Sequence, residues 1–184
     1  MLKKFLTMHA FAVITLLAPQ FGSAQGPPPQ APGGAGQVAR GGPPPPKQTM
    51  DVATAKKMVA AAEAAALAAN AVVSIAVVDS TGDLVYFERM DGAPARAVTS
   101  SQGKARAALL FGKPTKEVQD AITAGKPIAV TITNPAAGAW ELTPAQGGLP
   151  IIKDGKVVGA IGAGGSAPAN DEKFAQAGID VIAK

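Results

Sequence analysis

The chain has 184 residues, enough for one domain together with additional segments. It contains no cysteine, which excludes disulfide bonds, thiolate ligands and thiol redox chemistry. The formal charge is +4, but the basic residues are scattered and only 4% of the residues are aromatic. Surfaces that bind nucleic acid combine clustered basic residues with stacking rings, so we expect no nucleic-acid partner.

Residues 1–24 are typical of a secretory signal peptide. Lys3 and Lys4 precede a short apolar core at residues 11–18, and small residues lead to an expected cleavage before Gln25. We therefore predict a secreted or periplasmic protein. The apolar run is shorter than the roughly 20 residues that span a bilayer, so no stable membrane anchor is expected after cleavage; a retained anchor is the alternative. Cleavage also removes His9, the lone histidine, and with it histidine-based triads and metal sites.

Residues 25–48 are dominated by proline and glycine and contain almost nothing that a core could bury. This composition predicts a disordered linker, with a ligand for a proline-recognition domain as the alternative. The folded domain is expected at residues 49–184.

The domain is expected to begin with an alanine-rich helix over residues 50–70. Thr49 is the expected N-cap, with Asp51 in the first turn. A β-hairpin follows, with strands at residues 72–78 and 84–88. The intervening Asp, Ser and Gly residues are typical of a turn.

Two further helices are predicted, at residues 95–111 and 116–124, and glycine–lysine–proline triplets end both. Thr115 is positioned to cap the second of them. Residues 128–133 have the composition of a strand, although an extended segment is the alternative. Residues 134–143, which include the lone tryptophan, are expected to form a loop.

A second hairpin is predicted from residues 148–153 and 156–162, because Asp-Gly between apolar arms is a strong turn signal. The last helix is expected at residues 170–182, with Asn170 as its N-cap. Since the strands come as hairpins, the sheet should be antiparallel, and the fold class should be α+β with a central sheet flanked by helices.

Several residues are candidates for a binding site. Arg89 and Asp91 follow the first hairpin. They form either a local ion pair or turn cap, or an anion clamp beside Lys104, which lies on a helix face of small residues. The glycines of residues 159–165 either bind a dinucleotide or allow close approach of another backbone. The second interpretation is preferred, because the glycines follow a hairpin strand and not the first strand of a parallel unit.

In its ordered set of motifs the chain resembles the GlcG-like and HbpS-like haem-binding proteins, a family also described as the haem-degrading domain family. The resemblance covers residues 49–184. The motifs that carry it are Val77-Val78-Asp79-x-x-Gly82, Arg89-Met90-Asp91-Gly92-Ala93, Lys104-Ala105, Pro114-Thr115, Gly147-Gly148-x-Pro150-Ile151, Gly159-Ala160-Ile161-Gly162 and Asp171.

The resemblance implies a profilin-like fold, homo-oligomers from dimers to octamers, and haem as a cofactor. It also implies that Thr115 is the axial contact of the iron and that Arg89, Asp91 and Lys104 belong to the binding site, where the two cations could pair with propionates. A neutral hydroxyl is a weak ligand, so binding should be loose and reversible. The fallback ligands are Met58, Met90 and Tyr86.

We therefore expect an exported, oligomeric small-ligand binding protein that binds haem for sensing, transport or protection. An enzyme acting on haem or on a small organic acid, using Arg89, Asp91 and Lys104, is the second hypothesis. An accessory module without a ligand is the third.

Overall fold

The computed structural model describes residues 50–131 and 140–183. The predicted signal peptide and linker therefore lie outside the described residues. The regular elements, in chain order, are α1 (Val52–Ala68), β1 (Ser74–Asp79), β2 (Leu84–Arg89), α2 (Ala95–Phe111), α3 (Thr115–Thr123), β3 (Gly148–Lys153), β4 (Lys156–Gly164) and α4 (Pro168–Asp180).

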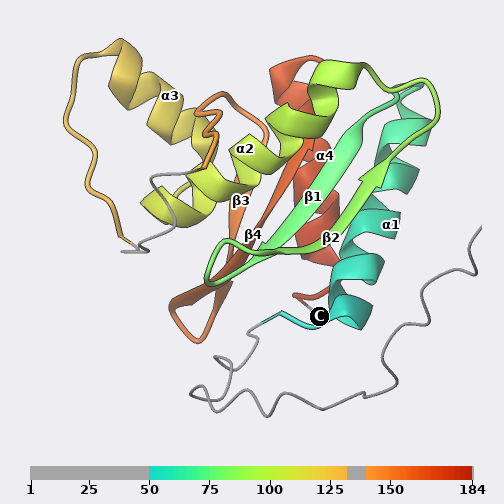
Figure 1. The fold of residues 1–184 in the computed structure, drawn as a ribbon, viewed down its shortest axis with the longest axis horizontal. Coiled ribbons are helices and arrows are strands. Elements are labelled where there is room, and N and C mark those ends of the chain that lie inside the picture. The colour runs from blue at the N-terminus through green and yellow to red at the C-terminus, as the bar shows by residue number, and fades with distance from the viewer. Residues whose placement is uncertain (1–49, 132–139, 184) are drawn as a thin grey trace, which may run out of the picture. The chain divides into compact units, whose positions relative to one another are not determined.

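The four strands form one sheet in the order β2-β1-β4-β3, and each neighbouring pair is antiparallel. All six residues of β1 are buried, which places this strand at the centre of the domain. Figure 1 shows helices on both sides of the sheet, with α2 in front and α1 and α4 behind. The predicted α+β class with a central antiparallel sheet flanked by helices is confirmed.

Each face of the sheet has its own apolar cluster. The larger cluster lies under α1 and α4 and includes Met58, Ile75, Ile161 and Phe174. The smaller cluster lies under α2 and is built mainly from short side chains, such as Ala105 and others of that helix. Alternate residues of β1 point to opposite faces, so this one buried strand contributes to both clusters.

Small residues let α2 pack unusually close to β4. A Cβ added at Gly162 would lie 2.6 Å from the backbone nitrogen of Ala105, closer than real Cβ contacts come. A Cβ added at Gly164 would lie 3.2 Å from the backbone nitrogen of Ser101, which is tighter than most real Cβ contacts. The second interpretation of these glycines, close backbone approach, therefore describes their role in the fold.

Both predicted hairpins are present. In the first, the Asp79 carboxylate accepts hydrogen bonds from the backbone nitrogens of Thr81 (2.9 Å) and Asp83 (3.1 Å). In the second, Asp154 and Gly155 both have positive φ, at 51° and 71°, as a tight two-residue turn requires.

The predicted starts of α1 and α4 are wrong. Asp51 is itself the N-cap of α1, because its carboxylate accepts a hydrogen bond from the Thr54 nitrogen at 2.8 Å; the expected cap, Thr49, lies outside the described residues. Asn170 lies inside α4, which begins at Pro168. Proline fixes φ near the helical value and lacks an N–H to satisfy, so it is favoured at the first helical position.

Residues 128–131 form no strand, so the predicted strand is wrong there, and residues 132–139 lie outside the described residues. Within the described part of the chain, no helix combines the length and apolarity needed to cross a membrane.

Candidate functional site

A buried ion pair joins two helices that pack on opposite faces of the sheet. Lys104 of α2 donates to Asp171 in the first turn of α4, with an Nζ–Oδ2 distance of 2.7 Å. The residues are only 4% and 1% exposed. Buried charges are tolerated when they are paired and hydrogen-bonded, so each of these two residues depends on the other.

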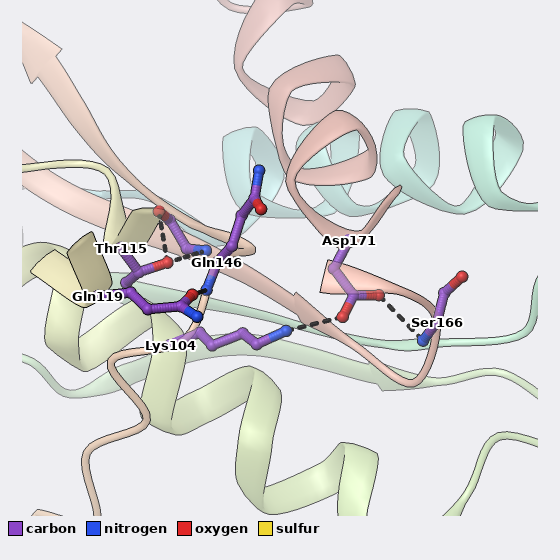
Figure 2. Close-up of polar contacts among 7 residues, drawn as sticks. Lys104, Thr115, Gln119, Gln146, Ser166 and Asp171 are labelled. Atoms are coloured by element: carbon purple, nitrogen blue, oxygen red, sulfur yellow. Dashed lines mark hydrogen bonds and ion pairs between the residues drawn. The ribbon is translucent and has the colours of Figure 1, made fainter. Parts of the chain in front are cut away.

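The second carboxylate oxygen of Asp171 accepts a hydrogen bond from the Ser166 nitrogen at 3.0 Å, as Figure 2 shows. Burial raises the pKa of Asp171 above its ordinary value of 3.8. The hydrogen bond and positive charge of Lys104, together with the Ser166 N–H, act in the opposite direction. The effect of burial on the pKa of Asp171 is therefore larger than the combined effect of its hydrogen-bond and charge partners.

Thr115 bonds to the first residue of β3. Its hydroxyl oxygen accepts a hydrogen bond from the Gly148 nitrogen at 2.8 Å and lies 3.3 Å from the Gly148 carbonyl oxygen, to which it donates. Thr115 is fully buried. Its predicted role as N-cap of α3 is wrong, since Pro114 holds that position and the Thr115 side chain makes no capping bond.

Gly147 and Gly148 bring these two contacts together. A Cβ at Gly147 would lie 2.8 Å from the Lys104 Nζ, and one at Gly148 would lie 2.9 Å from the Thr115 Cγ2. We refer to Lys104, Thr115, Gly148 and Asp171 as the buried polar junction. Next to it, the Gln119 side chain accepts a hydrogen bond from the Gln146 nitrogen at 3.0 Å (Figure 2).

The other two predicted site residues do not join this junction through any contact that the structure shows. Arg89, at the end of β2, donates from Nε and Nη2 to the Ala93 carbonyl oxygen, at 3.1 and 2.6 Å. Asp91 is exposed and forms no ion pair with Arg89. Neither an ion pair of Arg89 with Asp91 nor a clamp beside Lys104 is thus supported by a contact here, whereas the bonds of Arg89 to the Ala93 carbonyl fit the alternative of a local turn cap.

The fallback iron ligands Met58, Met90 and Tyr86 are either buried in the core or already hydrogen-bonded to other groups. Met58 is fully buried in the larger apolar cluster. The sulfur of Met90 accepts from the Val73 nitrogen at 3.4 Å. The Tyr86 hydroxyl donates to Glu88 at 3.4 Å, and Lys56 lies 5.6 Å from the centre of the Tyr86 ring.

The buried polar junction does not fit an axial iron site as it stands. The Thr115 hydroxyl has no exposed surface and is committed to the Gly148 peptide, so a metal would have to replace both hydrogen bonds. Among the described residues, no group of three or more His, Cys, Asp or Glu side chains is placed to hold a metal ion. The axial role of Thr115 therefore stays a prediction.

Asp171 is the charged residue of the junction that the sequence indicates only as part of the family's motifs. Lys104 and Asp171 are 67 positions apart, and no local pattern links them. One signal was available: a lysine surrounded by small residues on its helix face is expected to be buried, and a buried lysine needs an acidic partner.

The comparisons with known proteins agree with this fold. The sequence model of the family described as "Haem degrading protein HbpS-like" matches residues 50–180. The protein GlcG of Escherichia coli K12 is 39% identical over 93 residues, which cover 50% of this chain and 64% of GlcG. The chain thus matches somewhat less than two thirds of the length of this relative.

Among solved structures, HbpS superposes with a TM-score of 0.64 and 29% identity, over 79% of this chain and 98% of HbpS. A structure of HbpS from Streptomyces reticuli gives the same score and identity. PduOC, solved as a complex with haem, superposes with a TM-score of 0.63 and 22% identity. The alignment covers 72% of this chain and 94% of PduOC, and at this identity it supports the fold alone. The match over residues 50–180 shows that this chain belongs to the HbpS-like family of haem-degrading proteins.

Proposed function

We propose that this protein is an exported, oligomeric haem-binding protein that serves sensing, transport or protection. The observation that carries the proposal is the family match, which spans residues 50–180 and thus nearly the whole described domain. The family's description and the haem bound to its structural neighbour PduOC both make haem a plausible ligand.

The chemistry of the chain favours reversible binding. Strong haem ligation uses histidine, cysteine, methionine or tyrosine side chains. In the described domain the candidates Met58, Met90 and Tyr86 are buried or already hydrogen-bonded. Haem held without a strong protein ligand exchanges readily, which suits a sensor or carrier.

Titration of the purified protein with haemin tests this proposal. We expect a saturable shift of the Soret band at micromolar haemin. A spectrum that equals the sum of free haemin and protein at every ratio would contradict haem binding.

Export and oligomerisation need separate measurements. Mass spectrometry of the mature protein should find an N-terminus at Gln25, and cell fractionation should place the protein outside the cytoplasm. Size-exclusion chromatography with light scattering should give a mass of two to eight chains. An uncleaved cytoplasmic product contradicts the first expectation, and a clean monomer contradicts the second.

A second candidate is an enzyme acting on haem, because the family's description names haem degradation. Lys104, one of its predicted residues, is buried against Asp171 and is only 4% exposed. Time-dependent loss of the Soret band in the presence of a reductant and oxygen, beyond the loss of free haemin, would support turnover. A stable complex under the same conditions would favour simple binding.

A further inference from the structure

A groove of about 450 Å³ lies where the start of α1, the second hairpin and the end of α4 meet. Its volume is within the roughly 300–1,000 Å³ usual for small-molecule sites. None of the residues of the buried polar junction lines it, and its lining is mainly aliphatic. The large apolar members include Met50, Ile151, Ile152, Val158, Ile179 and Ile182.

The apolar surface of this groove extends from the core to the solvent. Met50 and Ile151 are only 4% and 3% exposed. Ile152 and Val181, by contrast, are 60% and 42% exposed. Exposed apolar surface with polar residues around it is typical of a binding site. The described lining holds no aromatic side chain on which a flat ring could stack, so an aliphatic chain is the better match.

Two lysines and one carboxylate complete the lining: Lys57, Lys153 and Asp51. Both carboxylate oxygens of Asp51 are engaged at the start of α1, because they accept hydrogen bonds from the Thr54 nitrogen at 2.8 Å and the Thr54 hydroxyl at 2.7 Å. Lys57 and Lys153 are exposed and form no ion pair with any described residue. The groove therefore combines an aliphatic surface with two cations that can bind an anionic head group.

We propose that this groove binds a medium-chain fatty acid, with the aliphatic chain along the isoleucines and the carboxylate held by Lys57 and Lys153. A second copy of this chain is a poorer occupant. A two-fold symmetric contact would bring the same lysines of both copies into one interface, where like charges repel. The site is additional to the proposed function and does not depend on it.

Isothermal titration calorimetry of the full chain with octanoate, decanoate and dodecanoate, each below its micelle concentration, tests the proposal. We expect saturable binding whose affinity rises by up to about fourfold for each added CH₂ group. 1-Decanol has the same chain as decanoate but no charge, and it should bind more weakly because it gains nothing from the lysines.

Two variants separate the head group from the aliphatic chain. Lys57→Gln/Lys153→Gln should weaken decanoate by about tenfold and leave 1-decanol nearly unchanged. Ile152→Glu should weaken both ligands at least tenfold, because it places a charge on the aliphatic wall. All three side chains are exposed, so these variants should fold normally.

Each variant has a matched control outside the groove. Lys56→Gln changes the neighbouring lysine of α1, and Ile122→Glu changes an isoleucine of α3 that is 54% exposed. Neither residue lines the groove, so both controls should change the affinity for decanoate by less than about threefold.

Decanoate binding that is lost in the groove variants and kept in the controls supports the proposal. Equal losses in all four would indicate unspecific adsorption and overturn it, as would the absence of saturable binding or tighter binding of 1-decanol than of decanoate. A lower mass of Ile152→Glu in light scattering, without fatty-acid binding to the unmodified chain, would assign this face to contacts between copies and also overturn it.

Haemin titration of the same variants keeps this site apart from the proposed function. An unchanged Soret shift in both groove variants supports a separate fatty-acid site. Loss of the haemin shift together with decanoate binding would overturn the proposal, because the groove would then belong to haem. If the unmodified protein binds decanoate and not haemin, the groove stands and the proposed function fails.

Discussion

Lys104 and Asp171 form an ion pair with an Nζ–Oδ2 distance of 2.7 Å that is almost wholly removed from solvent. The pair ties α2, on one face of the sheet, to the first turn of α4, which packs on the other. Because both charges are almost fully buried and each depends on the other, the contact holds the two layers in one fixed arrangement. Its loss should affect the fold before it affects any ligand.

Lys104→Met should lower the free energy of unfolding by about 3–5 kcal/mol, because Asp171 is left buried without its cation. Adding Asp171→Asn in the same chain should recover part of that loss, since the buried charge is then gone. Urea unfolding measures both. Lys116→Gln, which breaks the exposed pair with Asp120, is the control and should cost less than about 1 kcal/mol. Equal losses in Lys104→Met and in the control would show that the buried pair is not structural.

Because the pKa of Asp171 is raised, the contribution of this residue to the free energy of unfolding should depend on pH. Burial favours the protonated carboxyl in the folded state, so the folded pKa lies above the unfolded value of 3.8. The stability that this group contributes is then fully present below pH 3.8 and is lost as the pH rises through the folded pKa. Urea unfolding across this range should show wild-type stability falling with pH relative to the Lys104→Met/Asp171→Asn chain. A relative rise would mean that Lys104 lowers the pKa of Asp171 below its ordinary value.

The sequence predicts the local elements of this fold well, because their signals are local. The turn at residues 79–83 and the Asp-Gly turn both follow from residues that tolerate or stabilise turn conformations. Helix starts are harder: proline at the first helical position and a capping carboxylate compete with nearby threonine and asparagine. Local composition does not decide between them.

The site is predicted less completely, because its contacts join distant parts of the chain. Lys104 and Thr115 are both found at the buried polar junction, yet Thr115 binds the Gly148 peptide 33 positions away. This contact exists only because β3 packs beside α3, so the sequence alone does not predict it. Arg89 lies instead at the end of β2, where its Nε and Nη2 both donate to the Ala93 carbonyl. A family motif thus indicates which residues recur in order, and the packing decides which of them meet.

Thr115→Val should destabilise the protein by about 1–3 kcal/mol, because the buried Gly148 N–H and carbonyl both lose a partner while the side-chain volume is nearly kept. Thr115→Ser retains the hydroxyl and should cost clearly less. Thermal unfolding of the two variants gives the comparison. Equal costs would indicate that the methyl group, and not the hydrogen bonds, stabilises this contact.

Gly162→Ala should test how closely α2 packs on the sheet. The added Cβ would lie 2.6 Å from the Ala105 nitrogen, and a helix backbone cannot yield as a flexible side chain can. We expect a loss of about 1–3 kcal/mol as α2 shifts outward. Gly155→Asn in the same hairpin is the control: nothing lies within 4 Å of its added Cβ, and asparagine tolerates the positive φ of 71° better than most residues. If the two variants unfold at the same urea concentration, close packing of α2 against β4 does not limit stability. If Gly162→Ala alone is destabilised, the displaced helix should also disturb Lys104, and combining it with Lys104→Met should cost less than the sum of the two changes.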